Sequence, residues 1–233
     1  MAARTHLDRL ASPDTWSTTL AGILFDLDGT LVDSTEVVER QWWTFLDWYG
    51  LPAEAFPEPL HGMRAEDHIR KMLPASEVAT AVARLAELEA TDIAGVVAVA
   101  GAAELLDAVS KVLPWGIVTS GTLAVATARL AAAGLPTPSV LVTAEDVRAG
   151  KPNPEPYLIG LERLAVHGAV VVVEDAPSGV RSGLDAGCPV VAVTTSHPAA
   201  ELAEADVVVT NLRALGLTAP AKDDAAVLTA VRV

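Results

Sequence analysis

The chain has 233 residues, with 16 lysines and arginines, 30 aspartates and glutamates, and one cysteine. A chain of this length buries about 70–75% of its unfolded surface, so it can fold around its own core without disulfides or structural metal ions. The net charge of −14 argues against a nucleic-acid binder, because phosphate backbones are held by lysine and arginine. The lone Cys188 excludes an internal disulfide framework and suits a reducing cytoplasm.

No segment has the length and apolarity of a membrane span. The densest apolar run, Ala94–Ala103, is about half the ~18–20 residues that a bilayer requires. Residues 1–19 are polar and lack the apolar centre of a secretory signal, so we expect an N-terminal tail. Without a membrane span or a secretory signal, we expect a cytoplasmic protein. Since no exposed apolar seam stands out, we also expect a monomer.

Short apolar runs alternate with alanine-rich helical segments along most of the chain. Six runs are predicted as strands: Ala21–Phe25, Gly116–Val118, Val140–Val142, Ala169–Val173, Val190–Val193 and Val207–Val209. Helices are predicted at Ala102–Val112, Leu123–Ala133, Pro154–Leu164 and Pro177–Ala186. The strand runs are continuously apolar, as in strands buried on both faces. The alternation predicts an α/β fold, with a central parallel sheet between two layers of helices.

One region interrupts this alternation. Between Ser34 and Asp92 the pattern predicts three helices, Glu36–Tyr49, Ala65–Met72 and Glu77–Glu89, and no strand. Trp42 and Phe45 belong to a stripe at helical spacing, which favours the core of a small bundle over an aromatic binding site. The predicted division is therefore a tail at 1–19, a core at 20–32 and 97–233, and a helical insert at 33–96. A short helix is expected in Lys222–Val233.

Two carboxylates follow the first predicted strand. In Asp26-Leu27-Asp28-Gly29-Thr30 they are two residues apart, and Gly29 lets the chain bend so that both approach one point. Like charges placed together are costly unless a cation or a shared proton compensates them. Taken alone, an Asp-Gly pair is as compatible with a solvated turn.

Three more polar clusters follow strands or precede helices. Ser120 and Gly121 come after a strand, where a hydroxyl and free N–H groups can hold an anion, although a simple helix cap has the same pattern. Lys151, in Gly150-Lys151-Pro152, can neutralise both a carboxylate and a phosphate. Glu174 and Asp175 end a strand of valines and offer the oxygen ligands that Mg²⁺ prefers. Ligands of open α/β sheets bind at this edge.

The order and spacing of these four clusters resemble the haloacid dehalogenase-like hydrolase superfamily, in its phosphatase branch. The resemblance runs from about Leu20 to Val209. It implies a Rossmann-like three-layer core, with a helical cap inserted after the first strand. It also implies a Mg²⁺-dependent phosphatase that acts on a small sugar- or polyol-phosphate monoester. From the net charge and the lack of a membrane span, we expect no nucleic-acid or membrane partner.

The resemblance assigns roles to the matched residues. Asp26 would be the nucleophile that forms an aspartyl-phosphate, and Asp28 the general acid and then the general base. Ser120, Gly121 and Lys151 would hold the phosphoryl oxygens. Mg²⁺ would be held by Asp26, the Asp28 carbonyl and Asp175, with Glu174 as a ligand or an outer partner.

The loop before the second helix of the insert would face the substrate in sugar and polyol phosphatases. His61 and Arg64 are therefore the substrate-recognition candidates, although an exposed loop arginine would show the same pattern. Thr30 is expected to shape the turn after Asp28.

Three other activities occur in the superfamily. Dehalogenases lack the second acid that Asp28 provides. Phosphonate hydrolases use a cap lysine, for which Lys71 is the sole candidate. Sugar-phosphate mutases of the β-phosphoglucomutase type are the main alternative, but they carry a histidine ten residues after the second aspartate, where this chain has Val38. A purely binding role would need a defective motif, and none of the four is defective.

Overall fold

The computed structural model describes residues 14–58, 60–219 and 225–233. The strands are β1 (Thr15–Leu20), β2 (Gly22–Phe25), β3 (Val32–Asp33), β4 (Val97–Ala98), β5 (Trp115–Val118), β6 (Val140–Val142), β7 (Val170–Glu174), β8 (Val190–Val193), β9 (Val207–Val209), β10 (Leu215–Thr218) and β11 (Ala226–Val231). The α-helices are α1 (Thr35–Tyr49), α2 (Ala65–Met72), α3 (Ala75–Thr91), α4 (Ala102–Ser110), α5 (Leu123–Ala132), α6 (Glu155–Leu164) and α7 (Pro177–Asp185). Short 3-10 helices lie at Ala53–Ala55, Ala144–Asp146 and Leu212–Ala214.

A six-stranded parallel sheet forms the centre, in the order β6-β5-β2-β7-β8-β9. Side chains alternate between its two faces, so that Ile23 and Phe25 pack with α4 and α5, whereas Leu24 packs with α6 and α7. The predicted α/β class with a Rossmann-like three-layer core is therefore confirmed. β2 lies between β5 and β7, which places the end of the first strand in the middle of the sheet.

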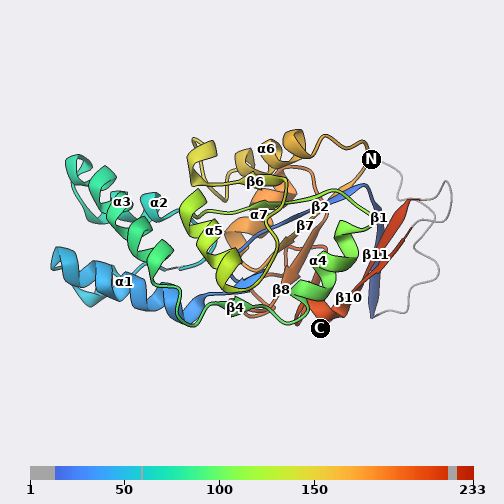
Figure 1. Ribbon diagram of the computed structural model, residues 1–233, viewed down its shortest axis with the longest axis horizontal. Coiled ribbons are helices and arrows are strands. Elements are labelled where there is room, and N and C mark those ends of the chain that lie inside the picture. The colour runs from blue at the N-terminus through green and yellow to red at the C-terminus, as the bar shows by residue number, and fades with distance from the viewer. Residues whose placement is uncertain (1–13, 59, 220–224) are drawn as a thin grey trace.

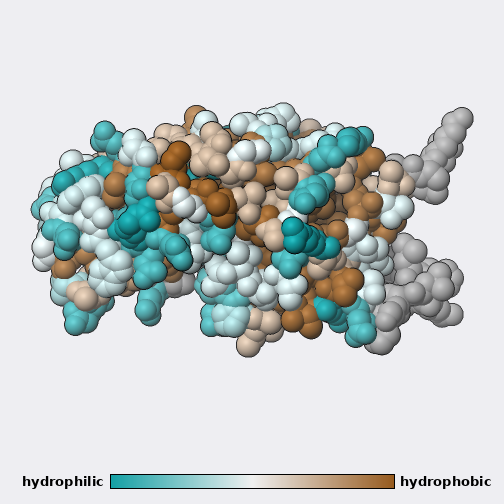
Figure 2. Space-filling model, turned by 60° about the horizontal axis from the view of Figure 1, so that its bottom comes forward, coloured by the Kyte–Doolittle hydropathy of each residue, from teal (hydrophilic) through white to brown (hydrophobic). Residues whose placement is uncertain are grey.

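Helices α1, α2 and α3 gather at one end of the molecule, to the left in Figure 1. They share a core of their own, in which Trp42, Phe45, Ile69 and Leu85 are buried. The expectation that the aromatic stripe builds a helical core is confirmed. The division into a cap and a core domain at 33–96 stays a prediction. Hydrophilic residues cover most of this helical end on the face shown in Figure 2.

The opposite end carries a three-stranded antiparallel sheet, β1-β11-β10 (Figure 1). Two predictions were wrong here. Residues 15–19 belong to β1 rather than to a tail, because they pair with β11 from Thr15↔Val231 onward. The segment 226–231 is a strand rather than a helix, because Ala226, Leu228 and Ala230 alternate into the core with period two. Residues 1–13 and 220–224 lie outside the described residues.

Within the described residues, no helix combines the length and the apolarity needed to cross a membrane.

Candidate active site

Asp26 and Asp28 lie directly beyond the carboxyl end of β2. The Asp26 N–H donates to the Val173 carbonyl at 2.9 Å, which continues the pairing of β2 with β7 for one more residue. The chain then turns, and Gly29 takes a φ of 86°, which only glycine adopts without strain. Asp26 is 4% exposed, and Asp28 is partly exposed to a cavity. Both carboxylates of the predicted pair are therefore held on one loop at the centre of the sheet.

The ammonium group of Lys151 is buried and contacts three oxygen atoms of the protein. Its Nζ lies 2.5 Å from Asp26 Oδ1, 2.7 Å from Glu174 Oε1 and 2.9 Å from the Val118 carbonyl. An ammonium group has three donors, so every one of them is used. Burial lowers the pKa of Lys151, but the Asp26 and Glu174 carboxylates outweigh it and raise that pKa above the ordinary value. Lys151 is therefore a permanent positive charge beside Asp26.

Glu174 is buried, and both of its carboxylate oxygens accept hydrogen bonds from the protein. Oε1 accepts hydrogen bonds from Lys151 and from the Tyr157 hydroxyl at 2.7 Å. Oε2 accepts from the backbone N–H groups of Asp175 at 3.1 Å and Ala176 at 3.4 Å. These contacts fix the carboxylate in one orientation, in which it holds Lys151 against Asp26.

Asp175 is held from two sides. Thr30 Oγ1 donates to its Oδ1 at 3.2 Å, and Ser196 Oγ donates to its Oδ2. Burial raises the pKa of Asp175 well above its ordinary value, and the neighbouring Asp26 raises it further. Burial also raises the pKa of Asp26 to about 7, although Lys151 lowers it. No pattern in the sequence indicated that Ser196 belongs to this site, because it lies twenty-one residues after Asp175 and follows β8 rather than β7.

The chemistry of this carboxylate cluster fits a divalent cation. Ligand oxygens of Asp26, Glu174 and Asp175 all lie within 4.8 Å of one another. When ionised, these groups carry three negative charges against the one positive charge of Lys151, which leaves two to be neutralised. Hard oxygen donors of this kind suit Mg²⁺. Asp26 and Asp175 are the better ligands, because each oxygen of Glu174 already accepts two hydrogen bonds, whereas each oxygen of Asp175 accepts one.

Ser120 and Gly121 lie beyond the end of β5. Helix α5 is capped by Thr122, whose Oγ1 accepts from the Val125 N–H at 3.3 Å, so the alternative that Ser120 is a simple cap of this helix does not hold. Ser120 Oγ instead donates to the Gly62 carbonyl at 3.0 Å, and the Gly121 N–H donates to Thr119 Oγ1 at 3.0 Å. Both residues line the same cavity as Asp26 and Asp28.

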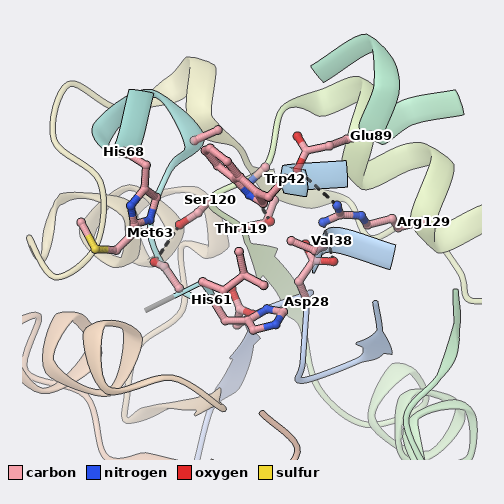
Figure 3. Close-up of a pocket in the computed structure, with 15 residues that line it drawn as sticks. Asp28, Val38, Trp42, His61, Met63, His68, Glu89, Thr119, Ser120 and Arg129 are labelled. Atoms are coloured by element: carbon pink, nitrogen blue, oxygen red, sulfur yellow. Dashed lines mark hydrogen bonds and ion pairs between the residues drawn. The ribbon is translucent and has the colours of Figure 1, made fainter. Parts of the chain in front are cut away.

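This cavity lies between the sheet edge and the inserted helices, and Figure 3 shows its wall. Its volume of about 60 Å³ has room for a few water molecules. Trp42, Val38 and Leu60 give it an apolar side, and His68 adds a buried imidazole whose Nε2 has no partner among the described residues. The polar residues at the end of the sheet thus face a wall of apolar side chains and histidine that comes from the inserted helices.

The structure places the two substrate-recognition candidates differently. His61 is 7% exposed, lines the cavity, and its Nε2 has no hydrogen-bond partner within the described chain. Burial lowers the pKa of His61. Arg64 instead pairs with Asp67 at 2.9 Å and lines an adjacent cavity. The Asp67 carboxylate neutralises the Arg64 guanidinium. Arg64 therefore lies beside the cavity of Asp26 and Asp28, with its charge already paired.

Two charged residues in the cavity wall were missed in the sequence. Arg129 on α5 and Glu89 on α3 are 4% and 12% exposed at their side chains, and they form an ion pair at 3.5 Å in the wall of the cavity (Figure 3). A signal for Arg129 was present, because it occupies the helical face that otherwise holds Val125, Ala126 and Leu130. A charge at such a position marks a buried ion pair.

Gly29 offers a stability test of this packing. A Cβ at Gly29 would lie 2.0 Å from Asp175 Oδ2, whereas Gly187, with a similar φ of 83°, has no atom within 4 Å of such a Cβ. We expect Gly187→Ala to cost about 1–2 kcal/mol of unfolding free energy through backbone strain. Gly29→Ala should cost about 2–4 kcal/mol, because it also pushes the Asp175 carboxylate from Thr30 and Ser196. Urea denaturation measures both, and equal losses would refute the steric argument.

The chain is similar to several known proteins. Residues 23–193 match the family model described as haloacid dehalogenase-like hydrolase. Hexitol phosphatase A of Escherichia coli strain K12 is 45% identical over 202 residues, which cover 84% of this chain and 94% of that protein. Glycerol-1-phosphate phosphohydrolase 2 of Saccharomyces cerevisiae is 34% identical, with 81% of each chain covered.

Solved structures have the same fold. A hydrolase from Pseudomonas syringae superposes with a TM-score of 0.75 at 24% identity, covering 83% of this chain and 94% of that one. A putative β-phosphoglucomutase from Thermotoga maritima gives a TM-score of 0.60 at 27% identity, covering 83% and 96%.

Proposed function

Because the chain belongs to the haloacid dehalogenase-like hydrolase family, we propose that it is a Mg²⁺-dependent phosphatase of small sugar or polyol phosphates. It is a phosphoric monoester hydrolase that works through an aspartyl-phosphate on Asp26. The observation that carries the proposal is the contact of Asp26 with Lys151, in a carboxylate cluster beside a cavity that Asp28 also faces. The relatives named as hexitol and glycerol-1-phosphate phosphatases support the substrate class.

Asp26 attacks phosphorus. Its Oδ atom forms the new bond to phosphorus while the bond to the substrate alcohol breaks, and Asp28 gives the leaving oxygen a proton. In the second step water attacks phosphorus, its proton passes to Asp28, and the bond to Asp26 breaks. The two aspartates are two residues apart on one loop, so both reach the same phosphoryl group.

The attack of a carboxylate on a phosphate dianion needs compensating positive charge. Lys151 supplies one charge at 2.5 Å from Asp26, and Ser120 adds a hydroxyl donor at the same edge of the cavity. Asp26, Asp175 and the Asp28 carbonyl would hold Mg²⁺, with Glu174 fixing Lys151. Bound Mg²⁺ would neutralise phosphoryl and carboxylate oxygens and so lower the repulsion between them.

The wall of the cavity also bears on the choice between hydrolysis and phosphoryl transfer to a second sugar. A mutase requires a group that handles protons near the sugar, and Val38 stands where the mutases of this family carry histidine. Val38 is 6% exposed and lines the cavity with Trp42, so that side is apolar. Water is then the expected acceptor of the phosphoryl group. The closed cavity is smaller than a hexitol phosphate, so α1–α3 must move for the substrate to enter.

A phosphate-release panel tests the proposal. Hexitol phosphates, glycerol 1-phosphate, 2-deoxyglucose 6-phosphate and glucose 1-phosphate are each incubated with the protein in Mg²⁺ or in EDTA. We expect turnover of about 1 per second or faster for at least one polyol or sugar phosphate, and only background release in EDTA. Release that is insensitive to EDTA would contradict the metal dependence. Isomerised sugar phosphate without free phosphate would identify a mutase instead.

A further inference from the structure

Arg129 joins the proposed acid/base residue to the inserted helices. Its Nη1 lies 2.6 Å from Asp28 Oδ1, and its Nη2 lies 3.5 Å from Glu89 Oε1. Figure 3 shows the guanidinium between these two carboxylates. The side chain is 4% exposed, so both ion pairs are shielded from solvent. None of the four sequence clusters includes Arg129 or Glu89.

We propose that Arg129 is a positioning residue that orients the Asp28 carboxylate for proton transfer, and that Glu89 holds Arg129 in place. The proposal rests on the function assigned above, in which Asp28 exchanges the proton. Arg129 acts through Asp28 and contacts neither Asp26 nor Lys151 in the interactions of the described residues.

The contacts of Asp28 support this role because its hydrogen bond from Ser34 and its ion pair with Arg129 meet at the same oxygen. Ser34 Oγ donates to Oδ1 at 2.7 Å, and Arg129 approaches the same Oδ1. Among the described residues, no hydrogen bond is made to Oδ2. A carboxylate that is clamped through one oxygen keeps a fixed plane, while the other oxygen can give or take a proton.

The position of Glu89 makes this clamp depend on two parts of the chain. Glu89 is near the end of α3 in the insert, and Arg129 is on α5 beside the sheet. Burial raises the pKa of the Glu89 carboxyl, while Arg129 lowers it. Arg129 Nε has no partner among the described residues, so the two carboxylates provide all its ion-pair contacts there. Removing either carboxylate leaves the buried guanidinium of Arg129 with one ion pair instead of two.

Substrates with different leaving groups can distinguish whether Arg129 positions Asp28 or has another role. Acetate departs from acetyl phosphate without a proton, whereas the alkoxide of glycerol 1-phosphate needs one. Formation of the phosphoenzyme from acetyl phosphate therefore does not depend on Asp28, but its hydrolysis does, since water must lose a proton. Rapid quenching of ³²P-labelled phosphoenzyme gives the rate of each step.

For Arg129→Met we expect formation of the phosphoenzyme from acetyl phosphate to stay near the wild-type rate. Hydrolysis of the phosphoenzyme, and its formation from glycerol 1-phosphate, should each slow by about 10- to 100-fold, as misplacement of a catalytic group does. The unchanged first step also shows that the variant is folded. Arg129→Lys, which keeps the charge but cannot span both carboxylates, should show the same pattern more weakly.

Glu89→Gln and a surface arginine complete the set. Glu89→Gln should slow the same two steps by a smaller factor and add nothing in the Arg129→Met background, because both act through one contact. Arg181→Met breaks an exposed pair with Asp185 and should leave every rate unchanged.

Two results would overturn the proposal. If formation from acetyl phosphate falls together with hydrolysis, Arg129 holds the phosphoryl group. If neither step with acetyl phosphate changes and only the KM for glycerol 1-phosphate rises, Arg129 binds the substrate alcohol. A wild-type protein that forms no phosphoenzyme would contradict the proposed function and, with it, this role of Arg129, whereas the two results above contradict the role and leave the proposed function standing.

Discussion

Asp26→Asn is expected to reduce Mg²⁺-dependent phosphate release by about 10⁴-fold or more, since an amide cannot form the acyl phosphate. The variant should stay folded, because burial already raises the pKa of Asp26 to about 7 and a neutral side chain of the same size is tolerated there. Glu174 remains to pair with Lys151. Phosphate release measures the activity, and urea denaturation measures the stability.

The control for this variant is Asp107→Asn. Asp107 forms an ion pair with Lys111 at 2.6 Å, close to the 2.5 Å of Asp26 and Lys151, but on the surface. It should leave activity and stability unchanged. An Asp26→Asn protein that is folded and still turns over substrate would eliminate Asp26 as the nucleophile.

Lys151→Met should have the largest effect on stability. The substitution leaves Asp26 and Glu174 buried without their shared positive charge, so we expect a loss of about 3–5 kcal/mol in the free energy of unfolding. Activity should be lost as well, because the positive charge that offsets the repulsion between Asp26 and the phosphate is removed. Urea denaturation in EDTA measures the first effect without a metal ion to compensate it.

A second substitution tests the cause of this loss. Glu174→Gln added to Lys151→Met removes one of the stranded charges, so part of the stability should return. Lys111→Met, which breaks the exposed pair with Asp107, should be nearly neutral. If Lys151→Met were as mild as Lys111→Met, the buried pairs of Lys151 would not be what stabilises the site.

The sequence predicted the parallel sheet because its strands are short and continuously apolar. Each strand buried on both faces stands out between alanine-rich helices, and β6, β8 and β9 match their predicted ranges. The same rule failed for β1 and β11. β1 is half-exposed and rich in threonine, so it forms no apolar run. β11 is apolar except at Thr229, but its burial of every second residue appears only when it pairs with β1 and β10.

The four clusters were found because each lies within a few consecutive residues after a strand or before a helix. Arg129 and Glu89 were not, because they are forty residues apart and meet only when α3 packs on α5. Arg64 shows the reverse case. Its loop position favoured a role in substrate recognition, yet the nearby Asp67 pairs with its guanidinium. Local spacing predicts strand-end motifs well, but it does not specify contacts between helices.

The most direct test of the account is the site of phosphorylation. The protein is mixed with acetyl phosphate and Mg²⁺, quenched within milliseconds and treated with borohydride, which reduces an aspartyl-phosphate to homoserine. We predict that peptide mass spectrometry finds homoserine at position 26 and aspartate at position 28. Homoserine at position 28, or at neither position, would contradict the assignment of Asp26 as the nucleophile.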